Sequence, residues 1–261
     1  MKEKLYTIPL MDAFHADGEC PFCHIERSLE HNAIDFILGT AYMESDIREA
    51  TDNTGFCRHH LQLMYDYGNS LGNALMLKTH IKKLNQELTN EVKHFKHATG
   101  NGNEQSEQAG RGKFSLFKKS GQANSLSAFL RKKEQTCYVC DYYKNTYDRY
   151  LDTFFHLYKT NPEFTDMIKA SKGFCLHHLE ELLTEADSNL NNKQKADFYP
   201  LMLSITEKNM KRIEEDISWF VDKFDYRNKD ADWKNSKDAI PRTMQKLVGG
   251  FPADPPYKES K

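Results

Sequence analysis

The sequence lacks the features that would place it in a membrane or give it a general affinity for nucleic acid. No apolar run approaches the roughly 20 residues that a membrane-spanning helix needs. Charge of one sign is not in excess, because the formal net charge of the 261 residues is −2. The apolar part of the N-terminal stretch is too short for a secretory signal. We therefore expect a cytoplasmic protein with no membrane span.

Common catalytic and nucleotide-binding motifs are also missing. The sequence contains no phosphate-binding loop, no dinucleotide fingerprint, no Gly-x-Ser-x-Gly and no His-Glu-x-x-His. No segment of any length alternates with the period of a β-strand, whereas apolar residues recur at spacings of three and four along much of the chain. These patterns predict an all-α protein and indicate no familiar enzyme class.

Cysteine is scarce, and all six cysteines belong to a repeated pattern. A Cys-x-x-Cys pair precedes Gly-Phe-Cys-Arg-His-His-Leu at residues 55–61, and a second pair precedes Gly-Phe-Cys-Leu-His-His-Leu at residues 173–179. Three cysteines per copy would leave one unpaired in each copy if they formed disulfides. Thiols also stay reduced in the cytoplasm. The pattern therefore favours metal binding.

The spacing predicts two metal sites, each with three cysteines and one histidine. Cys-x-x-Cys and Cys-x-x-His each place two ligands about one helical turn apart, and this set of ligands is typical of structural zinc. A helix that leaves the first pair, with a shorter segment returning, would close a hairpin, so we expect each copy to hold its own ion. The predicted first site is Cys20, Cys23, Cys57 and His60, and the predicted second site is Cys137, Cys140, Cys175 and His178.

Two features of these sites stay open at this stage. His59 and His177 are the alternatives for the fourth ligand, although positions i and i+3 share a helix face and so favour the later histidine of each pair. An iron–sulfur cluster is the alternative to zinc, because three cysteines and a histidine can also hold one. A closed shell leaves no metal-bound water to activate, which argues against hydrolytic catalysis. Oxidation of the thiolates would still permit a redox-sensing role.

Glycine and polar residues gather between the two copies and divide the chain. Residues 98–125 have the composition of a flexible linker. They separate a first helical repeat at 1–97 from a second at 126–230, and a C-terminal helix with an extended tail follows at 231–261. We expect the two repeats to pack as an internal pseudo-dimer. Residues 1–19 are expected to form a lead-in arm, and Ser236 is expected to cap the last helix.

The linker also carries the one cluster that favours nucleic acid. Basic residues surround two aromatic residues there, a combination that can bind nucleic acid. Acidic residues flank the cluster, so a solvated linker is the preferred interpretation. The residues concerned are Arg111, Lys113, Phe114, Phe117, Lys118 and Lys119.

Several longer stretches outside the linker have sequences distinctive enough to compare with known families. They are Tyr6-Thr-Ile-Pro-Leu-Met-Asp-Ala-Phe14, Glu19-Cys-Pro-Phe-Cys23, Tyr42-Met-Glu-Ser-Asp-Ile-Arg48, Ala74-Leu-Met-Leu-Lys-Thr-His80 and Asp232-Trp-Lys-Asn-Ser-Lys-Asp238. Together with both Gly-Phe-Cys motifs they resemble an uncharacterised bacterial family, domain of unknown function 6062. The resemblance implies a bacterial protein with two cysteine-rich halves and implies no activity. The residues themselves predict a non-enzymatic zinc-binding module that interacts with, or regulates, an unknown protein partner.

Overall fold

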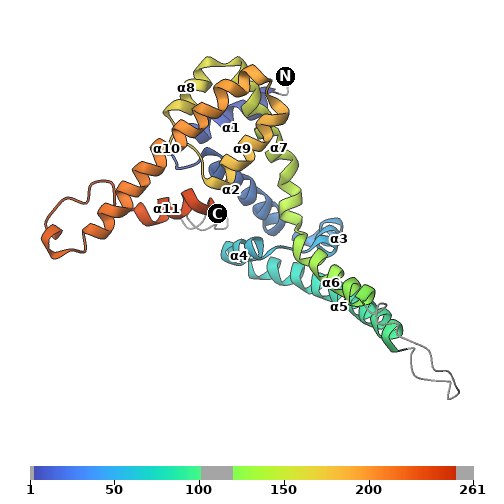
Figure 1. Cartoon of the computed structure of the whole chain (residues 1–261). Coiled ribbons are helices and arrows are strands. Elements are labelled where there is room, and N and C mark those ends of the chain that lie inside the picture. Colours follow the sequence, from blue (N-terminus) through green and yellow to red (C-terminus); the bar gives the residue numbers. More distant parts are fainter. Residues whose placement is uncertain (1–2, 101–119, 251–261) are drawn as a thin grey trace, which may run out of the picture. The chain divides into compact units, whose positions relative to one another are not determined.

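The computed structural model describes residues 3–100 and 120–250, and this part of the chain is helical without strands (Figure 1). The prediction of an all-α protein is therefore confirmed for the described residues. None of the described helices is both long enough and apolar enough to cross a membrane. The α-helices are α1 (Glu3–His15), α2 (Pro21–Asp35), α3 (Ser45–Thr54), α4 (Arg58–Tyr67), α5 (Ser70–Gly100), α6 (Ser120–Gln135), α7 (Tyr138–Thr160), α8 (Pro162–Ala170), α9 (Leu176–Asn189), α10 (Asn192–Asp222) and α11 (Ala239–Val248).

The described residues form two compact units that are interleaved in the sequence. Unit 1 takes residues 3–31 and 143–250, and unit 2 takes residues 32–100 and 120–142. The boundaries fall inside α2 and α7. The units therefore differ from the sequential division predicted from composition, because each contains parts of both halves of the chain.

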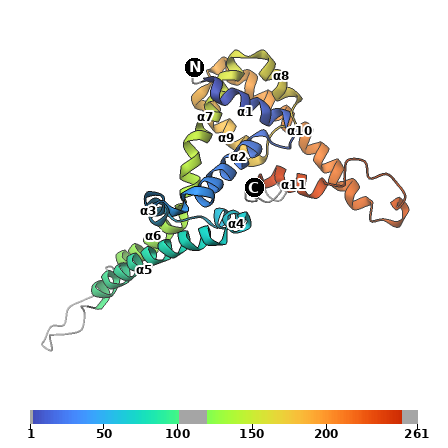
Figure 2. The same cartoon turned by 180° about the vertical axis from the view of Figure 1, so that it is seen from behind.

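Unit 1 is built around an aromatic core. The ring of Phe22 in α2 lies 5.7 Å from that of Phe154 in α7 and 6.1 Å from that of Phe174, just before α9. Phe22 and Phe154 meet edge to face, a geometry that adds to the free energy gained by burying apolar surface. Figures 1 and 2 show α1, α8, α9 and the first part of α10 gathered around this core.

The first residues of unit 1 form a helix where a lead-in arm was expected. Helix α1 buries Leu10 and Phe14 in the core, whereas Ile8 is 66% exposed. Four-residue spacing explains the difference, since Leu10 and Phe14 share a helix face. Pro9 lies within α1 and is itself exposed.

Unit 2 is built around α5, against which α3 and α6 pack (Figures 1 and 2). An ion pair of 2.6 Å between Lys133 and Glu87 joins α6 to α5. A π-helical turn (Phe36–Thr40) and a 3-10 turn (Ala41–Met43) lead from α2 to α3. The side chain of Asn69 donates a hydrogen bond of 2.6 Å to the carbonyl oxygen of Leu38, which fixes the turn before α5.

The predicted linker overlaps described helix at both ends. Helix α5 runs to Gly100 and α6 begins at Ser120, so regular structure covers the ends of the stretch 98–125. The basic and aromatic residues on which a nucleic-acid interface would depend, Arg111 to Lys119, lie outside the described residues.

Candidate metal centres

The structure brings the eight predicted ligands together in two clusters, but it pairs them differently from the prediction. Within each cluster the ligand atoms all lie within 4.8 Å of one another. Each Cys-x-x-Cys pair joins the Gly-Phe-Cys motif of the other copy, so the predicted pairing within each copy is wrong. Centre 1, in unit 1, consists of Cys20, Cys23, Cys175 and His178. Centre 2, in unit 2, consists of Cys57, His60, Cys137 and Cys140.

Packing and backbone hydrogen bonds account for this exchange. In unit 1, Phe22 lies between the two ligands of the first Cys-x-x-Cys, and its ring packs on α7 and on the residue before Cys175. In unit 2, the backbone N–H of Tyr138 donates a hydrogen bond of 2.9 Å to the carbonyl oxygen of Gly55. The hydroxyl of Thr136 donates another, of 2.6 Å, to the carbonyl oxygen of Thr54. The second Cys-x-x-Cys is thus held against the first Gly-Phe-Cys loop.

Every ligand pair lies at the N-terminal end of a helix. Cys57 and Cys175 are the N-cap residues of α4 and α9, and Cys20 and Cys137 directly precede α2 and α7. The unpaired N–H groups and the positive end of the helix dipole at such a terminus stabilise a thiolate. The sulfur of Cys175 accepts one of these N–H groups, that of His178, at 3.4 Å.

Backbone geometry and close packing both require glycine at the first position of each Gly-Phe-Cys motif. Gly55 and Gly173 have φ angles of 73° and 77°, a region that other residues rarely adopt. A Cβ atom on Gly55 would lie 2.9 Å from Cε1 of His80, and one on Gly173 would lie 3.0 Å from Cγ2 of Ile205. Glycine therefore allows the chain to turn into the helix that carries the cysteine and histidine.

Centre 1 has the dimensions of a tetrahedral single-ion site. The sulfurs of Cys23 and Cys175 lie 3.7 Å apart. The Nδ1 atom of His178 lies 3.1 Å from the sulfur of Cys175, 3.4 Å from that of Cys20 and 3.5 Å from that of Cys23. The three cysteines are 2% exposed or less, and His178 is 1% exposed. The shell is thus closed to solvent.

A carboxylate lies behind the histidine of centre 1. The Nε2 atom of His178 faces a carboxylate oxygen of Glu26 at 3.5 Å, a distance at which it makes no hydrogen bond. The hydroxyl of Tyr143 donates to the other oxygen of Glu26 at 3.4 Å. A carboxylate in this place orients a metal-binding imidazole with Nδ1 toward the ion and raises its basicity. The sequence offered no signal for Glu26, because nothing in its local pattern distinguishes it from other glutamates of α2.

In each centre the pKa of one thiol is lowered and that of another is raised. Hydrogen bonds from Cys20 and Cys23 lower the pKa of Cys175, while the bond with Cys175 raises the pKa of Cys23. Burial alone would lower the pKa of His178, but the nearby sulfurs of Cys175 and Cys20 and the carboxylate of Glu26 raise that pKa to about 12. The cluster thus holds positive charge strongly, and a bound metal ion would replace these protons.

In centre 2 the thiols of Cys57 and Cys140 show the same opposite shifts in pKa. Hydrogen bonds from Cys137 and Cys140 lower the pKa of Cys57, and the bonds with Cys137 and Cys57 raise the pKa of Cys140. In both centres the thiol whose pKa is lowered is therefore the N-cap cysteine of the Gly-Phe-Cys motif. Its position at the helix N-terminus agrees with this order.

Helix α11 covers centre 1 through a polar face. The ammonium group of Lys246, which is 1% exposed, donates hydrogen bonds of 2.6 Å to the carbonyl oxygen of Glu19 and 2.5 Å to that of Lys172. These two residues precede the two ligand segments of the centre. The backbone N–H of Gly250 donates to the sulfur of Cys23 at 3.3 Å. A Cβ atom on Gly249 would lie 3.6 Å from the sulfurs of both Cys23 and Cys175.

The prediction from sequence did not include this cover. Gly249 ends α11 as its C-cap, with a φ angle of 85° that glycine adopts readily. The expected cap at Ser236 is wrong: α11 begins after Asp238, and the Ser236 hydroxyl donates to the carbonyl oxygen of Trp233. Burial lowers the pKa of Lys246, and the charges of Glu19 and Cys20 oppose this effect. A lysine on the buried side of a short amphipathic helix is the signal that could have been noticed.

Centre 2 has the same ligands but a more open face. The Nδ1 atom of His60 lies 3.2 Å from the sulfurs of Cys57 and Cys137 and 3.4 Å from that of Cys140. His60 and Cys137 are buried, at 1% and 3% exposure. Cys57 and Cys140 are only partly buried. One side of the cluster therefore reaches solvent.

The structure also separates the candidates for the fourth ligand. His60 and His178 are buried and turn Nδ1 toward the thiols of their clusters. His59 and His177 are exposed. The i and i+3 spacing brings His60 and His178 beside the N-cap cysteines, as the helical geometry requires.

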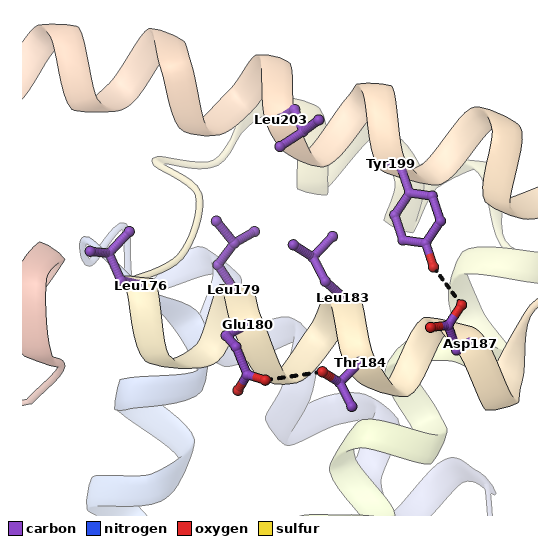
Figure 3. A pocket seen from close by; sticks show the side chains of 8 residues that line it. All are labelled: Leu176, Leu179, Glu180, Leu183, Thr184, Asp187, Tyr199 and Leu203. Atoms are coloured by element: carbon purple, nitrogen blue, oxygen red, sulfur yellow. Dashed lines mark hydrogen bonds between the residues drawn. The ribbon is translucent and has the colours of Figure 1, made fainter.

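Two pockets in unit 1 lie near centre 1 but have a different chemistry. One, of about 520 Å³, lies between α9 and α10. Figure 3 shows three leucines side by side on α9 and Leu203 on α10 across from them, with Tyr199 donating to Asp187 at one end. The other, of about 470 Å³, is lined by charged side chains such as Arg212 and Arg242. Both arginines already bond to the acidic residues Glu19 and Asp216. Neither pocket brings further cysteines or histidines together.

The chain belongs to a family of unknown function, designated DUF6062, whose model matches residues 1–254. The resemblance noted in the sequence is therefore confirmed at the level of the family. No curated protein and no solved structure matches the chain. Any statement about function thus depends on the two centres themselves.

Proposed function

We propose that each centre holds one zinc ion and that the chain is a non-enzymatic zinc-binding protein whose helices serve interaction or regulation. The observation that carries this proposal is the closeness of the ligand atoms, which all lie within 4.8 Å of one another in each centre. With Zn–S bonds of about 2.3 Å, a tetrahedral site separates its sulfurs by about 3.8 Å. The 3.7 Å between Cys23 and Cys175 agrees with that edge.

The same distances favour a single ion over an iron–sulfur cluster. A cluster places its ligands on different irons, so their ligand atoms lie farther apart than those around one ion. Three thiolates and a neutral histidine around Zn²⁺ carry a formal charge of −1. In centre 1, the ammonium group of Lys246 and the N-termini of α2 and α9 supply compensating charge.

The proposed role is structural and depends on a reducing compartment. Each ion would join two helix N-termini that are distant in the sequence, so metal binding and folding would be coupled. The cytoplasm keeps thiols reduced, and we propose it as the location, with a protein as the partner. We also propose that the two copies of the motif arose by duplication and then exchanged their Gly-Phe-Cys halves.

Metal analysis of variants tests both the zinc ions and their ligands. Protein purified under reducing conditions is expected to hold two zinc ions per chain and to lack the brown colour of an iron–sulfur protein. Cys20→Ser and Cys175→Ser remove ligands of one centre, so the double variant should still hold one zinc ion. Cys20→Ser with Cys57→Ser removes ligands of both centres and should leave none.

The control for this experiment is the substitution of a cysteine pair within centre 2. Cys57→Ser with Cys137→Ser should also leave one zinc ion, held by centre 1. Binding of Co²⁺ to wild-type protein should give the visible absorption of a tetrahedral thiolate complex. Protein that contains no stoichiometric metal after reducing purification would refute the proposal. Loss of both ions from the Cys20/Cys175 variant would refute the ligand assignment.

A further inference from the structure

We propose that Cys57 and Cys140 form the reactive thiol pair of this protein. A peroxide or alkylating reagent would modify them before the other cysteines, and oxidation would join them in a disulfide that releases the ion of centre 2. This inference rests on the proposed function, because it takes centre 2 to be loaded with zinc.

Cys57 and Cys140 are more accessible to solvent than the other four cysteines. Cys57 and Cys140 are partly exposed, whereas the other four cysteines are between 0% and 3% exposed. The two partly exposed cysteines come from different helices of centre 2: Cys57 is the N-cap of α4, and Cys140 lies in the first turn of α7. The buried ligands Cys137 and His60 lie on the inner side of the same cluster. A reagent from solvent therefore meets Cys57 and Cys140 first.

The sulfurs of Cys57 and Cys140 are also close enough to form a disulfide after a small movement. The sulfurs of Cys57 and Cys140 lie within 4.8 Å of each other, so a small movement brings them to the bonding distance of a disulfide, about 2.0 Å. One thiolate sulfur attacks an oxygen of the peroxide, the O–O bond breaks, and a sulfenic acid forms as water leaves after taking up a proton. The second thiolate attacks that sulfur, the S–S bond forms, the S–O bond breaks, and a second water leaves.

The oxidation removes two metal ligands at once. The peroxide accepts the two electrons that the thiolates lose, and the protons come from solvent. A disulfide sulfur does not act as a thiolate ligand, so only His60 and Cys137 would remain on the ion. Two ligands do not complete a structural zinc site, and the ion would therefore leave.

Helix α11 and the residue that follows Gly249 protect the thiols of centre 1. Gly250 donates its N–H to the sulfur of Cys23, and Lys246 places a buried ammonium group beside the same ligand segments. Hydrogen bonds and positive charge reduce the electron density available on a thiolate, and α11 also blocks the approach of a reagent. Helix α11 belongs to unit 1, so this protection applies to centre 1. The two centres should therefore react at different rates.

A timed oxidation tests this inference on the full chain. The protein is first assayed for two zinc ions, then treated with hydrogen peroxide beside a chromogenic zinc chelator. One zinc ion per chain should leave in a first phase, and the second should leave at least roughly tenfold more slowly. After alkylation of the remaining thiols, peptide mapping with fragmentation should find a disulfide between Cys57 and Cys140.

Two variants and a second reagent sharpen the test. Lys246→Met should loosen α11 and bring centre 1 into the fast phase, while Lys237→Met, at an exposed position before α11, should leave both phases unchanged. N-ethylmaleimide on untreated protein should label Cys57 and Cys140 first. Equal loss of both ions, a first label on Cys20, Cys23 or Cys175, or a disulfide to Cys137 would overturn the inference. A protein with fewer than two ions before oxidation would instead contradict the proposed function.

Discussion

The two centres use the same ligands in the same local geometry, yet one is sealed and the other is partly open. In both, a Cys-x-x-Cys and a Cys-x-x-His meet at two helix N-termini. Centre 1 has the additional cover of α11 and the carboxylate of Glu26 behind His178. Centre 2 leaves two of its cysteines partly exposed. The ligands therefore determine which ion can bind, and the residues around them determine how well solvent and reagents are kept from the site.

Removal of one buried ligand should produce the largest difference between the centres. Cys175→Ala should remove one zinc ion and lower the free energy of unfolding by more than about 4 kcal/mol, because the aromatic core of unit 1 surrounds this centre. Cys57→Ala should also remove one ion, with a smaller loss. Metal content and denaturant unfolding followed by circular dichroism measure both effects. Equal destabilisation by the two substitutions would show that α11 and the aromatic core add nothing.

Loosening the cover of centre 1 should make the two centres more alike. Lys246→Met removes a buried donor from the carbonyl oxygens of Glu19 and Lys172 and should cost about 2–4 kcal/mol. Exchange of isotopically labelled zinc into centre 1 should then approach the rate at centre 2. Lys237→Met, which changes an exposed lysine, is the matched control. An unchanged exchange rate in the Lys246 variant would assign the protection to another contact.

The glycine of each motif should matter at both centres to a similar degree. Gly55→Ala combines a positive φ angle with a close approach to His80 and should cost about 2–3 kcal/mol. Gly68→Ala is a useful control, since Gly68 has a φ angle of 94° but open space around its Cα atom; it should cost about 1 kcal/mol. Thermal unfolding of the two variants separates backbone strain from the clash. Equal melting temperatures would mean that the His80 ring moves aside without cost.

The carboxylate behind His178 should give the smallest of these effects, and only at centre 1. Glu26→Gln keeps the shape of the side chain and removes its charge, so zinc affinity at centre 1 should fall roughly tenfold. Competition with a chelator of known affinity measures this change, and Glu163→Gln on the exposed surface of α8 serves as control. A matching fall at centre 2 would contradict a local action on His178.

The helices and the eight ligands could be predicted from local sequence, but their pairing could not. Cys-x-x-Cys and Gly-Phe-Cys-x-His-His are nearly identical in the two copies, so ligand spacing alone fits either arrangement equally well. The choice depends on contacts between distant residues, such as that of Phe22 with Phe174. The role of Lys246 was hidden for the same reason, because its partners precede it by 74 and 227 positions.

One local difference between the copies does carry information about the pairing. Tyr138 follows the first cysteine of its pair and donates its N–H to Gly55, whereas the corresponding residue of the other copy is Pro21, which has no N–H. The hydrogen bond that holds the first Gly-Phe-Cys loop is therefore available only from the second Cys-x-x-Cys. The observed pairing therefore keeps a backbone hydrogen bond that the alternative pairing, with Pro21 at this place, would lose.

The exchange of ligands between the copies also sets an order for assembly during synthesis. All four ligands of centre 2 lie in the sequence between the two halves of centre 1. A growing chain exposes Cys20, Cys23, Cys57 and His60 long before Cys137 leaves the ribosome, since N-terminal segments fold first. A zinc ion taken up at that moment would bind the four ligands of the first copy, the arrangement that the sequence alone suggests. If the centres hold zinc as proposed, formation of the native pairing would require such an early ion to be withheld or released, and the timing of metal binding would then affect folding.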